Sequence, residues 1–244
     1  MNIIGDIAGN YKTLIALLKK MPDHEVISLG DMIDRGPRSK EVLDFFMSQG
    51  RAVLGNHEHM LVDLYKAEMG FYKNQKPYYR EDIWFRNGGL DTCKSFKDDF
   101  SYYDHKVSEI IDEKYIRFLE GLPFYIKEKG LFLSHAPKSS SVNLDEVSDL
   151  GHGFYYDFGF DPKSEASLLW YRGVPSFWQD ILQIHGHNAW KDVLCYNKEN
   201  PSGVFLKELG GGKCFAYDID TSKAKVLTGY NSETKQFYQQ EYID

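Results

Sequence analysis

Short apolar stretches alternate with helix-like segments over the first 60 residues, and this alternation limits the fold more than any other feature. Asn2–Ile4, Val26–Leu29 and Ala52–Leu54 have the length and composition of buried strands. Between them, apolar residues recur at helical spacing behind Asn10 and Ser39, which we expect to cap two helices. This order predicts parallel strands covered by helices, with ligands bound beyond the carboxyl ends of the strands.

The remainder of the chain changes character twice. Residues 60–122 are polar and favour helix, and we interpret them as a helical insertion packed over one rim of the site. Further strands are expected at Phe124–Lys127, Leu131–Ser134, Ile181–His185, Val204–Leu209, Cys214–Ile219 and Lys225–Tyr230. Because no repeat or low-complexity linker divides the chain, we predict a single domain over residues 1–244. Its expected architecture is an α/β sandwich of two mixed sheets flanked by helices.

The charge of the chain narrows the class of partner. A formal net charge of −7 argues against a dedicated nucleic-acid binder, which usually carries a basic face. It does not exclude phosphorylated substrates, since bound divalent cations reverse the local field. We therefore expect no nucleic-acid binding and a phosphorylated protein, nucleotide or other small phosphoester as the substrate.

The cysteines and the N-terminal segment indicate a compartment. Cys93, Cys195 and Cys214 are odd in number, far apart and in no C-x-x-C pair. We therefore expect neither a disulfide framework nor a thiolate zinc site, which suits a reducing cytoplasm. The chain has no run of 18 apolar residues, and its first residues do not resemble a signal peptide. The sequence thus predicts a cytoplasmic protein that does not contact a membrane.

Each of the first three strands ends in a polar cluster, and two later strands end in the same way. The clusters lie at Gly5–Asp6, Gly30–Gly36, Gly55–Glu58, Ser134–Ala136 and His185–His187. Carboxylates at the ends of adjacent parallel strands converge, and divalent cations remove the repulsion between them. Any one Asp, Asn or His here could be only a helix cap or a core residue, but together they favour a metal site. Asp, Asn and His ligands suit Mn, Fe or Zn better than Ca or Mg.

The order of these motifs resembles a known family. GD, GDMIDRG, GNHE, a later His and GH follow one another as in the calcineurin-like metallophosphoesterase superfamily, within its phosphoprotein phosphatase branch. The segments WFRNGG, LLWYRG and IDT, at residues 84–89, 168–173 and 219–221, resemble small bacterial Ser/Thr phosphatases and diadenosine tetraphosphatases. The resemblance implies a four-layer α/β/β/α sandwich and a pair of divalent ions, with Mn expected and Fe or Zn as alternatives.

The resemblance also implies roles for individual ligands. Asp31 would bridge both ions, Asp6 would bind the first, and Asn56, His135 and His187 would bind the second. A hydroxide held between the ions would attack phosphorus in line.

Four further residues would act on the substrate. His57, paired with Asp34, would protonate the leaving oxygen. Arg35 and Arg172 would hold the phosphate, since a guanidinium matches its oxygens. An arginine that follows an aromatic pair, as Arg172 does, can alternatively be a stacking partner.

Two positions depart from the family pattern. Ala8 stands where the first motif, GD-x-H-G, has a histidine that binds the first metal. His185 lies two residues before His187 on the same strand, so it either replaces the missing ligand or packs beside the site. Leu54 stands where the eukaryotic protein phosphatases have an arginine before GNHE, which removes one phosphate contact.

Three functions remain open on this sequence. The first is a phosphomonoesterase, foremost a Ser/Thr-type protein phosphatase. The second is a dinucleoside polyphosphate hydrolase, which would tolerate Leu54 and would stack bases on aromatic side chains. The aromatic candidates are Trp84, Trp170, Tyr171 and Trp178. The third is a catalytically impaired phosphate-binding protein that lost one metal ligand at Ala8.

Overall fold

Two mixed β-sheets form the centre of the computed structural model, which describes residues 1–72, 81–101, 103–140, 167–206 and 214–244. The five-stranded sheet has the order β11-β10-β1-β2-β3. Its strands are β1 (Asn2–Ile4), β2 (Val26–Ser28), β3 (Arg51–Ala52), β10 (Val226–Asn231) and β11 (Gln236–Glu241). Strands β1, β2 and β3 are parallel, as the alternation of strands and helices predicts, whereas β10 pairs antiparallel with β1 and β11.

The six-stranded sheet has the order β4-β5-β6-β9-β7-β8. Its strands are β4 (Tyr125–Glu128), β5 (Leu131–Ser134), β6 (Leu182–His185), β7 (Leu194–Asn197), β8 (Val204–Phe205) and β9 (Cys214–Asp218). Strands β5, β6 and β9 are parallel, and the remaining pairs are antiparallel. The carboxyl ends of β5 and β6 therefore lie at one edge of this sheet.

An apolar layer joins the two sheets. Ile3, Ile27 and Leu29 of the five-stranded sheet pack in one buried cluster with Leu133 and Ile184 of the six-stranded sheet. Burying one side chain of this size contributes roughly 1.5–3 kcal/mol to the free energy of unfolding. This layer fixes the two sheets against each other, and with them the two sets of strand ends that carry the polar clusters.

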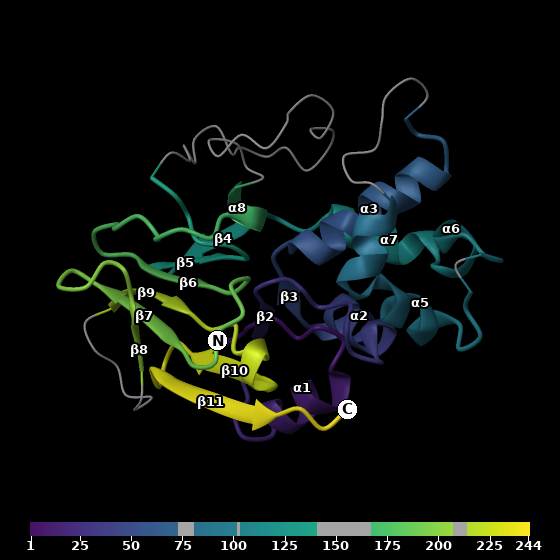
Figure 1. The fold of residues 1–244 in the computed structure, drawn as a ribbon. Coiled ribbons are helices and arrows are strands. Elements are labelled where there is room, and N and C mark those ends of the chain that lie inside the picture. Colours follow the sequence, from purple (N-terminus) through teal and green to yellow (C-terminus); the bar gives the residue numbers. More distant parts are fainter. Residues whose placement is uncertain (73–80, 102, 141–166, 207–213) are drawn as a thin grey trace.

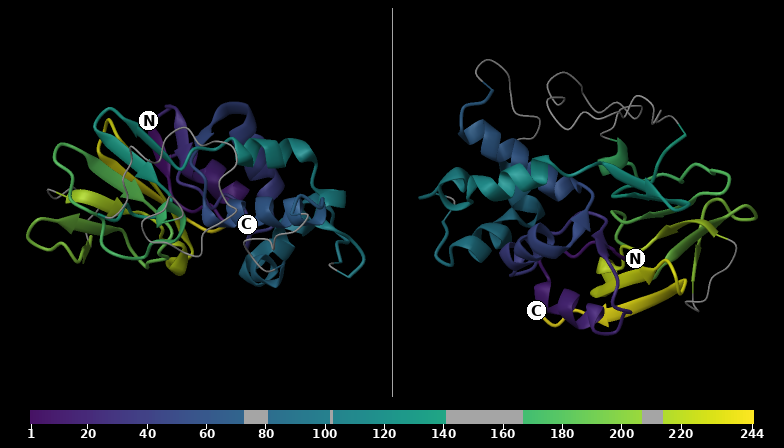
Figure 2. Two further views of the ribbon diagram at one scale, coloured as in Figure 1. Left: turned by 90° about the horizontal axis from the view of Figure 1, so that it is seen from above. Right: turned by 180° about the vertical axis from the view of Figure 1, so that it is seen from behind.

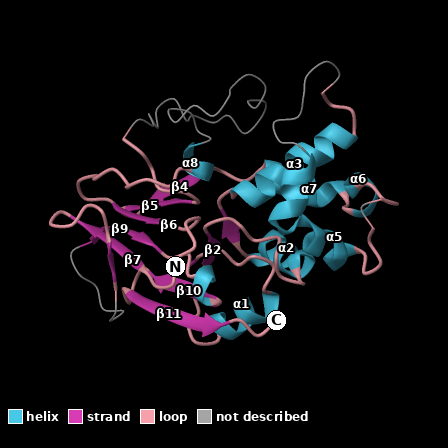
Figure 3. Ribbon diagram, viewed as in Figure 1, coloured by secondary structure: helices cyan, strands magenta, loops and turns pink. Residues whose placement is uncertain are grey.

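A second apolar layer lies between the five-stranded sheet and two helices, α1 (Tyr11–Leu18) and α2 (Ser39–Gln49). Leu14 and Leu17 of α1 and Val42 and Phe46 of α2 are buried there, at the helical spacing that the sequence shows. The predicted α/β fold of two mixed sheets flanked by helices is confirmed (Figure 3).

The other helices gather on one side of the sheets, between β3 and β4 in the chain (Figures 1 and 2). They are α3 (Asn56–Glu68), α4 (Glu81–Trp84), a π-helical turn at Phe85–Gly89, α5 (Leu90–Phe96), α6 (Val107–Ile110) and α7 (Glu113–Glu120). A short helix, α8 (Ser167–Trp170), precedes β6, and a 3₁₀ turn at Ser222–Ala224 precedes β10. No helix in the part of the chain described above is long and apolar enough to cross a membrane.

Several local expectations differ from the structure. Strands β7 and β11 were not predicted. In β11, most side chains around the buried Phe237 are polar, which hides the pattern of a strand. Asn10 precedes α1 but makes no capping bond, since its amide donates to the carbonyls of Ile7 and Ala8. Ser39 lies inside α2, and its hydroxyl accepts a hydrogen bond from the backbone N–H of Asp34. The predicted strand residues 207–209 lie outside the described residues.

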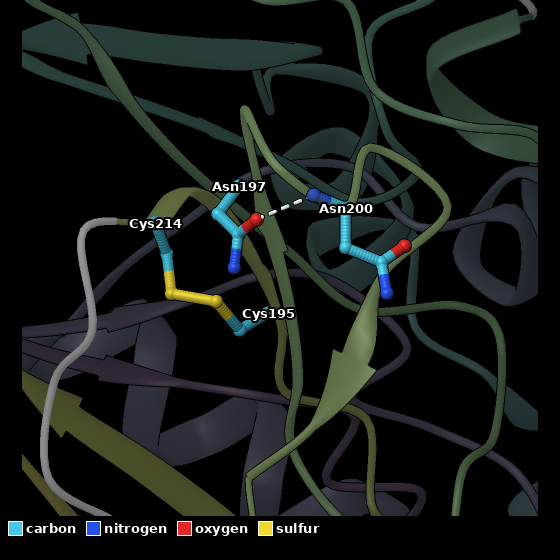
Figure 4. The surroundings of a disulfide bond; sticks show 4 residues. All are labelled: Cys195, Asn197, Asn200 and Cys214. Atoms are coloured by element: carbon cyan, nitrogen blue, oxygen red, sulfur yellow. Dashed lines mark hydrogen bonds between the residues drawn. A yellow bond between two sulfur atoms is a disulfide. The ribbon is translucent and has the colours of Figure 1, made fainter.

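The expectation of unpaired cysteines is wrong for two of the three. Cys195 and Cys214 form a disulfide that joins β7 to β9 (Figure 4). The two residues are 19 apart in sequence, and only the antiparallel pairing of these unpredicted neighbours brings their Cα atoms to 5.7 Å. Cys93 is buried and free. The cysteine pattern therefore gives no support to the expected reducing compartment.

Candidate metal centre

Five loops meet at the carboxyl edges of β1, β2, β3, β5 and β6. Backbone hydrogen bonds tie them together: the N–H of Ala8 donates to the carbonyl of Asp31, and the N–H of Gly186 donates to that of His135. Asp31 and His187 have φ of 47° and 75°, a left-handed conformation that is strained for any residue but glycine. These sharp turns direct polar side chains back toward the strand ends instead of into solvent.

Four side chains point their ligand atoms at one another. His135 Nε2 lies 2.8 Å from Asn56 Oδ1, 3.1 Å from His187 Nδ1 and 3.3 Å from Asp31 Oδ1. His187 Nδ1 lies 3.0 Å from the same Asn56 oxygen. All four residues are buried. The structure thus brings together the predicted ligands of the second ion.

The hydrogen bonds around this group leave it rich in acceptors. His135 Nδ1 donates to the carbonyl of Leu29 at 2.9 Å, so the ring presents the lone pair of Nε2 to its neighbours. That lone pair faces an amide oxygen, a carboxylate oxygen and a second imidazole nitrogen. A proton on His187 Nδ1 can satisfy only one of these acceptors at a time, whereas a cation between them would satisfy all. The donor set therefore fits a divalent ion of the Mn, Fe or Zn type.

The predicted first position lies beside Asp6. The backbone N–H of His187 donates to both Asp6 oxygens, at 3.2 and 3.3 Å. Burial raises the pKa of Asp6 well above its usual value, and the charges of Asp220 and Asp31 raise it further. Such a group of buried carboxylates is stable as anions only with a compensating positive charge. Ala8 directs only a methyl group from this loop, and it is buried.

The Asp31 carboxylate is an anion in this setting. Burial opposes its ionisation, but interactions with His135, His57 and His187 lower its pKa to about 2. The backbone N–H of His57 also donates to Asp31 Oδ1 at 3.1 Å. Asp31 therefore reaches the ligand group with its negative charge in place.

His57 and Asp34 form a closely bonded pair. His57 Nδ1 donates to Asp34 Oδ2 at 2.5 Å, and the same carboxylate accepts from Trp84 Nε1 and from the hydroxyl of Thr92. Burial lowers the pKa of His57, but the charges of Asp31 and Asp34 and the bond to Asp34 outweigh it and raise the pKa to about 9. The pair can hold a proton on the imidazole at neutral pH.

The two predicted phosphate ligands lie at the mouth of the centre. Arg35 Nη2 donates to His57 Nε2 at 3.0 Å, and the arginine is exposed. Arg172 is also exposed, and its Nη1 donates to the carbonyl of His187 at 3.2 Å. Both guanidinium groups thus contact residues of the centre while remaining open to solvent.

His185 has different neighbours from His187. Its Nδ1 lies 3.2 Å from the carbonyl of Gly186 and 3.5 Å from Asp218 Oδ2, and its ring packs against Tyr196. Burial lowers its pKa to about 3, so the ring is neutral. Its Nδ1 thus contacts Asp218, and its Nε2 is buried with no hydrogen-bond partner among the described residues, so a ligand role for His185 stays a prediction.

The aromatic candidates for base stacking divide into two kinds. Trp84 is buried and donates to Asp34, so its ring offers no face to a nucleobase. Trp170 is half-buried and packs edge-on against His187. Trp178 carries Lys127 and Lys138 over its ring, and Tyr171 donates to the carbonyl of Val174. Trp170 is the aromatic residue in contact with the ligand group.

Comparisons with known proteins agree with this geometry. The calcineurin-like phosphoesterase family matches residues 2–218. The chain belongs to that family. The resemblance in its motifs is confirmed.

Individual relatives are similar over shorter stretches or at lower identity. A symmetrical bis(5'-nucleosyl)-tetraphosphatase from Salmonella paratyphi A is 48% identical over 67 residues, which is 24% of this chain and 24% of that protein. The match thus spans about a quarter of that relative's length. A Saccharomyces cerevisiae protein serine/threonine phosphatase structure covers 100% of the chain and 80% of its own, with 14% identity and a TM-score of 0.59. A putative diadenosine tetraphosphatase structure covers 100% and 94%, with 15% identity and a TM-score of 0.56.

Glu58 is a residue beside the ligand group to which the sequence analysis gave no role. Its carboxylate is fully buried and accepts hydrogen bonds from four backbone N–H groups, those of Gly55, Asp31, Met32 and Ile33. Burial and the charge of Asp31 raise its pKa to about 8. The carboxylate thus shapes the loop that presents Asp31. Its position three residues after Gly55 is the spacing of a capping box, which was the available signal.

Asp218 and Asp220 were also missed as residues of the centre. Asp220 Oδ2 accepts from the N–H of Ala189 at 2.6 Å, which fixes the turn after His187. Asp218 Oδ2 accepts from Asn188 and from Trp190 Nε1 in the same turn. Asp218 is the last residue of β9, and Asp220 belongs to the IDT segment that follows it. The sequence does not reveal that β9 pairs with β6, which brings both residues to the centre.

Replacing Glu58 with Gln should destabilise the protein. An amide nitrogen cannot accept, so at least one pair of buried N–H groups loses its acceptor, at about 1–3 kcal/mol for each group. We expect the free energy of unfolding in urea to fall by roughly 2–4 kcal/mol. Glu109→Gln is the matched control, because Glu109 accepts from Lys106 N–H at an exposed helix start. Equal stability of the Glu58→Gln variant and the wild type would contradict this role.

The His57–Asp34 pair should make stability depend on pH. The pKa of His57 rises from 6.5 to about 9 on folding, so its contribution is complete below pH 6.5 and is lost as the pH rises through 9. In EDTA, the unfolding free energy of the wild type relative to His57→Gln should fall by on the order of 3 kcal/mol across this window. A difference that stays constant with pH would refute the assignment.

Proposed function

We propose that the chain hydrolyses phosphomonoesters at a pair of divalent ions, with Mn²⁺ the expected ion and Fe or Zn the alternatives. The observation that supports the proposal is the convergence of Asp31, Asn56, His135 and His187, whose ligand atoms lie 2.8 to 3.3 Å from one another in the pairs given above. Asp6, a buried carboxylate whose pKa is raised by burial and by the charges of Asp220 and Asp31, is the proposed ligand of the first ion. Ions bound there would activate water as the nucleophile and offset charge on the phosphoryl oxygens.

The surrounding residues would bind the substrate and move a proton. Arg35 and Arg172 hold the phosphate from the solvent side through their guanidinium groups. His57 gives the proton on Nε2 to the leaving oxygen, and Asp34 holds the opposite nitrogen in its protonated form. In the structure Nε2 accepts a hydrogen bond from Arg35 Nη2 at 3.0 Å, so engagement of Arg35 with the phosphate would free Nε2 to carry the proton beside the leaving oxygen.

The first candidate substrate is a phosphorylated Ser or Thr of a protein. The complete GDMIDRG and GNHE motifs support it. The second candidate is a dinucleoside polyphosphate. The name of the Salmonella relative and the half-buried Trp170 beside His187 favour it. Leu54, which is buried, offers no additional phosphate contact and fits the second candidate as well as the first. A phosphate-binding protein without turnover is the third alternative, against which the intact His57–Asp34 pair argues.

A substrate panel with added Mn²⁺ tests the proposal. We expect hydrolysis of p-nitrophenyl phosphate, abolished by EDTA and reduced at least 100-fold in Asp31→Asn, since that change weakens both ions. Asp23→Asn, in the turn before β2, is the control and should keep full activity. Preferential release of phosphate from a phosphopeptide, or preferential cleavage of diadenosine tetraphosphate, separates the two substrate classes. Absence of Mn-dependent hydrolysis of every member of the panel would refute the enzymatic proposal.

A further inference from the structure

Residues 84–92, which contain the WFRNGG motif, contact the loop that carries Asp34 and Arg35. They form the end of α4, the π-helical turn and the start of α5. The backbone N–H of Arg35 donates to the carbonyl of Gly88, and Arg35 Nε donates to the carbonyl of Asn87, both at 3.4 Å. This segment of the helical insertion is thus bonded to the loop, although the function proposed above gives it no part.

Two glycines of the motif allow the close contact. The φ of Gly88 is 114°, a backbone conformation that favours glycine, and it interrupts the helix. A Cβ at Gly88 would lie 2.7 Å from the Arg35 nitrogen and 2.8 Å from Arg35 Cγ. A Cβ at Gly89 would lie 2.5 Å from Trp84 Cδ2. The first glycine therefore lets the segment meet Arg35, and the second lets the Trp84 ring pack against the segment's own backbone.

Both oxygens of the Asp34 carboxylate accept hydrogen bonds from this segment. Trp84 Nε1 donates to Oδ2 at 2.9 Å, and the Thr92 hydroxyl donates to Oδ1 at 2.6 Å. The same hydroxyl accepts from the backbone N–H of Asp34 at 2.9 Å. None of these three residues is more than 1% exposed. The direction of the carboxylate is therefore fixed from two sides.

Asp34 passes this orientation on to His57. Its Oδ2 also accepts from His57 Nδ1 at 2.5 Å, so a rotation of the carboxylate would turn or release the imidazole ring. That rotation would break the buried bonds to Trp84 and Thr92, at a cost of about 1–3 kcal/mol for each. Precision matters here, because a misplacement of about 1 Å can lower a rate about 10²-fold. The two donors therefore keep the His57 ring in one orientation.

The same segment stabilises a strained stretch of backbone. Asp34 and Arg35 both have a left-handed φ, which is uncommon for residues other than glycine. Their backbone N–H groups donate to the Thr92 hydroxyl and to the carbonyl of Gly88. Such strain persists only where the surrounding structure determines the conformation. The insertion thus holds the backbone of Asp34 as well as its side chain.

We propose that Trp84 and Thr92 are positioning residues, which hold Asp34 so that the His57 ring presents Nε2 to the leaving oxygen. This inference rests on the proposed function, because it assigns the two residues to the proton-transfer step. As the bond between phosphorus and the leaving oxygen breaks, the proton moves from His57 Nε2 to that oxygen, and Trp84 and Thr92 keep their own protons. The helical insertion would then complete the proton donor of the site.

Trp84→Phe and Thr92→Val test this role, because each removes a donor and keeps an apolar side chain in its place. With Mn²⁺, we expect kcat for phenyl phosphate, which has a poor leaving group, to fall about 10- to 100-fold in either variant. The fall for p-nitrophenyl phosphate should be much smaller, since its leaving group needs less help from a proton. KM and the calorimetric affinity for Mn²⁺ should not change. Thr92→Val nearly preserves the shape of the side chain, so it decides the question if Trp84→Phe does not fold.

Tyr115→Phe is the matched control for these variants. The Tyr115 ring lies in the same buried cluster as Trp84, and its hydroxyl donates to a different carboxylate, that of Asp44, at 2.8 Å. Tyr115→Phe therefore removes a similar bond from the insertion without touching Asp34. It should keep the wild-type ratio of kcat for the two substrates.

The His57→Gln background separates positioning from a general loss of structure. Because this variant has no imidazole to orient, adding Trp84→Phe or Thr92→Val to it should lower activity little further. Unchanged activity in the single variants, equal losses for both substrates, or full losses in the His57→Gln background would overturn the positioning role. If Asp31→Asn still abolishes hydrolysis in that case, the proposed function stands. A wild type without Mn-dependent hydrolysis would overturn both.

Discussion

The burial of several carboxylates at one edge of the two sheets is the constraint on which the centre depends. Asp6, Asp31, Asp218 and Asp220 are all buried, and Asp220 and Asp31 raise the pKa of Asp6. Protein donors offset part of this repulsion, through the N–H groups that bond Asp6, Asp218 and Asp220 and through the histidines beside Asp31. The repulsion that these donors leave uncompensated requires bound cations. Metal binding and the folding of this edge are therefore coupled.

Glycines allow the loops that carry the ligand residues to approach each other closely. A Cβ on Gly30 would lie 2.7 Å from Gly55 Cα, and one on Gly55 would lie 2.2 Å from the Asp31 nitrogen. Both glycines are therefore required for the loops after β2 and β3 to touch, which places Asn56 beside Asp31. Asp34 and Arg35 also have left-handed φ of 73° and 64°, and such strain gathers at functional sites that the rest of the fold stabilises.

Sequence reasoning succeeded where local periodicity and motif order determine the structure. The parallel strands β1 to β3, and the approach of His135 and His187 to Asn56, follow from strand ends that meet at one edge. It failed where distant segments meet without a local signal. The pairing of Cys195 with Cys214 and the four N–H donors of Glu58 both depend on tertiary contacts. The secondary-structure propensities of individual residues carry no information about such contacts.

The central claim is that a divalent ion is bound by the side chains of Asp31, Asn56, His135 and His187. Crystals grown with Mn²⁺ and measured near the manganese absorption edge test it most directly. The account predicts an anomalous peak within coordination distance of all four side chains, lost in Asp31→Asn crystals. An ion bound elsewhere, with no peak between these four residues, would contradict it.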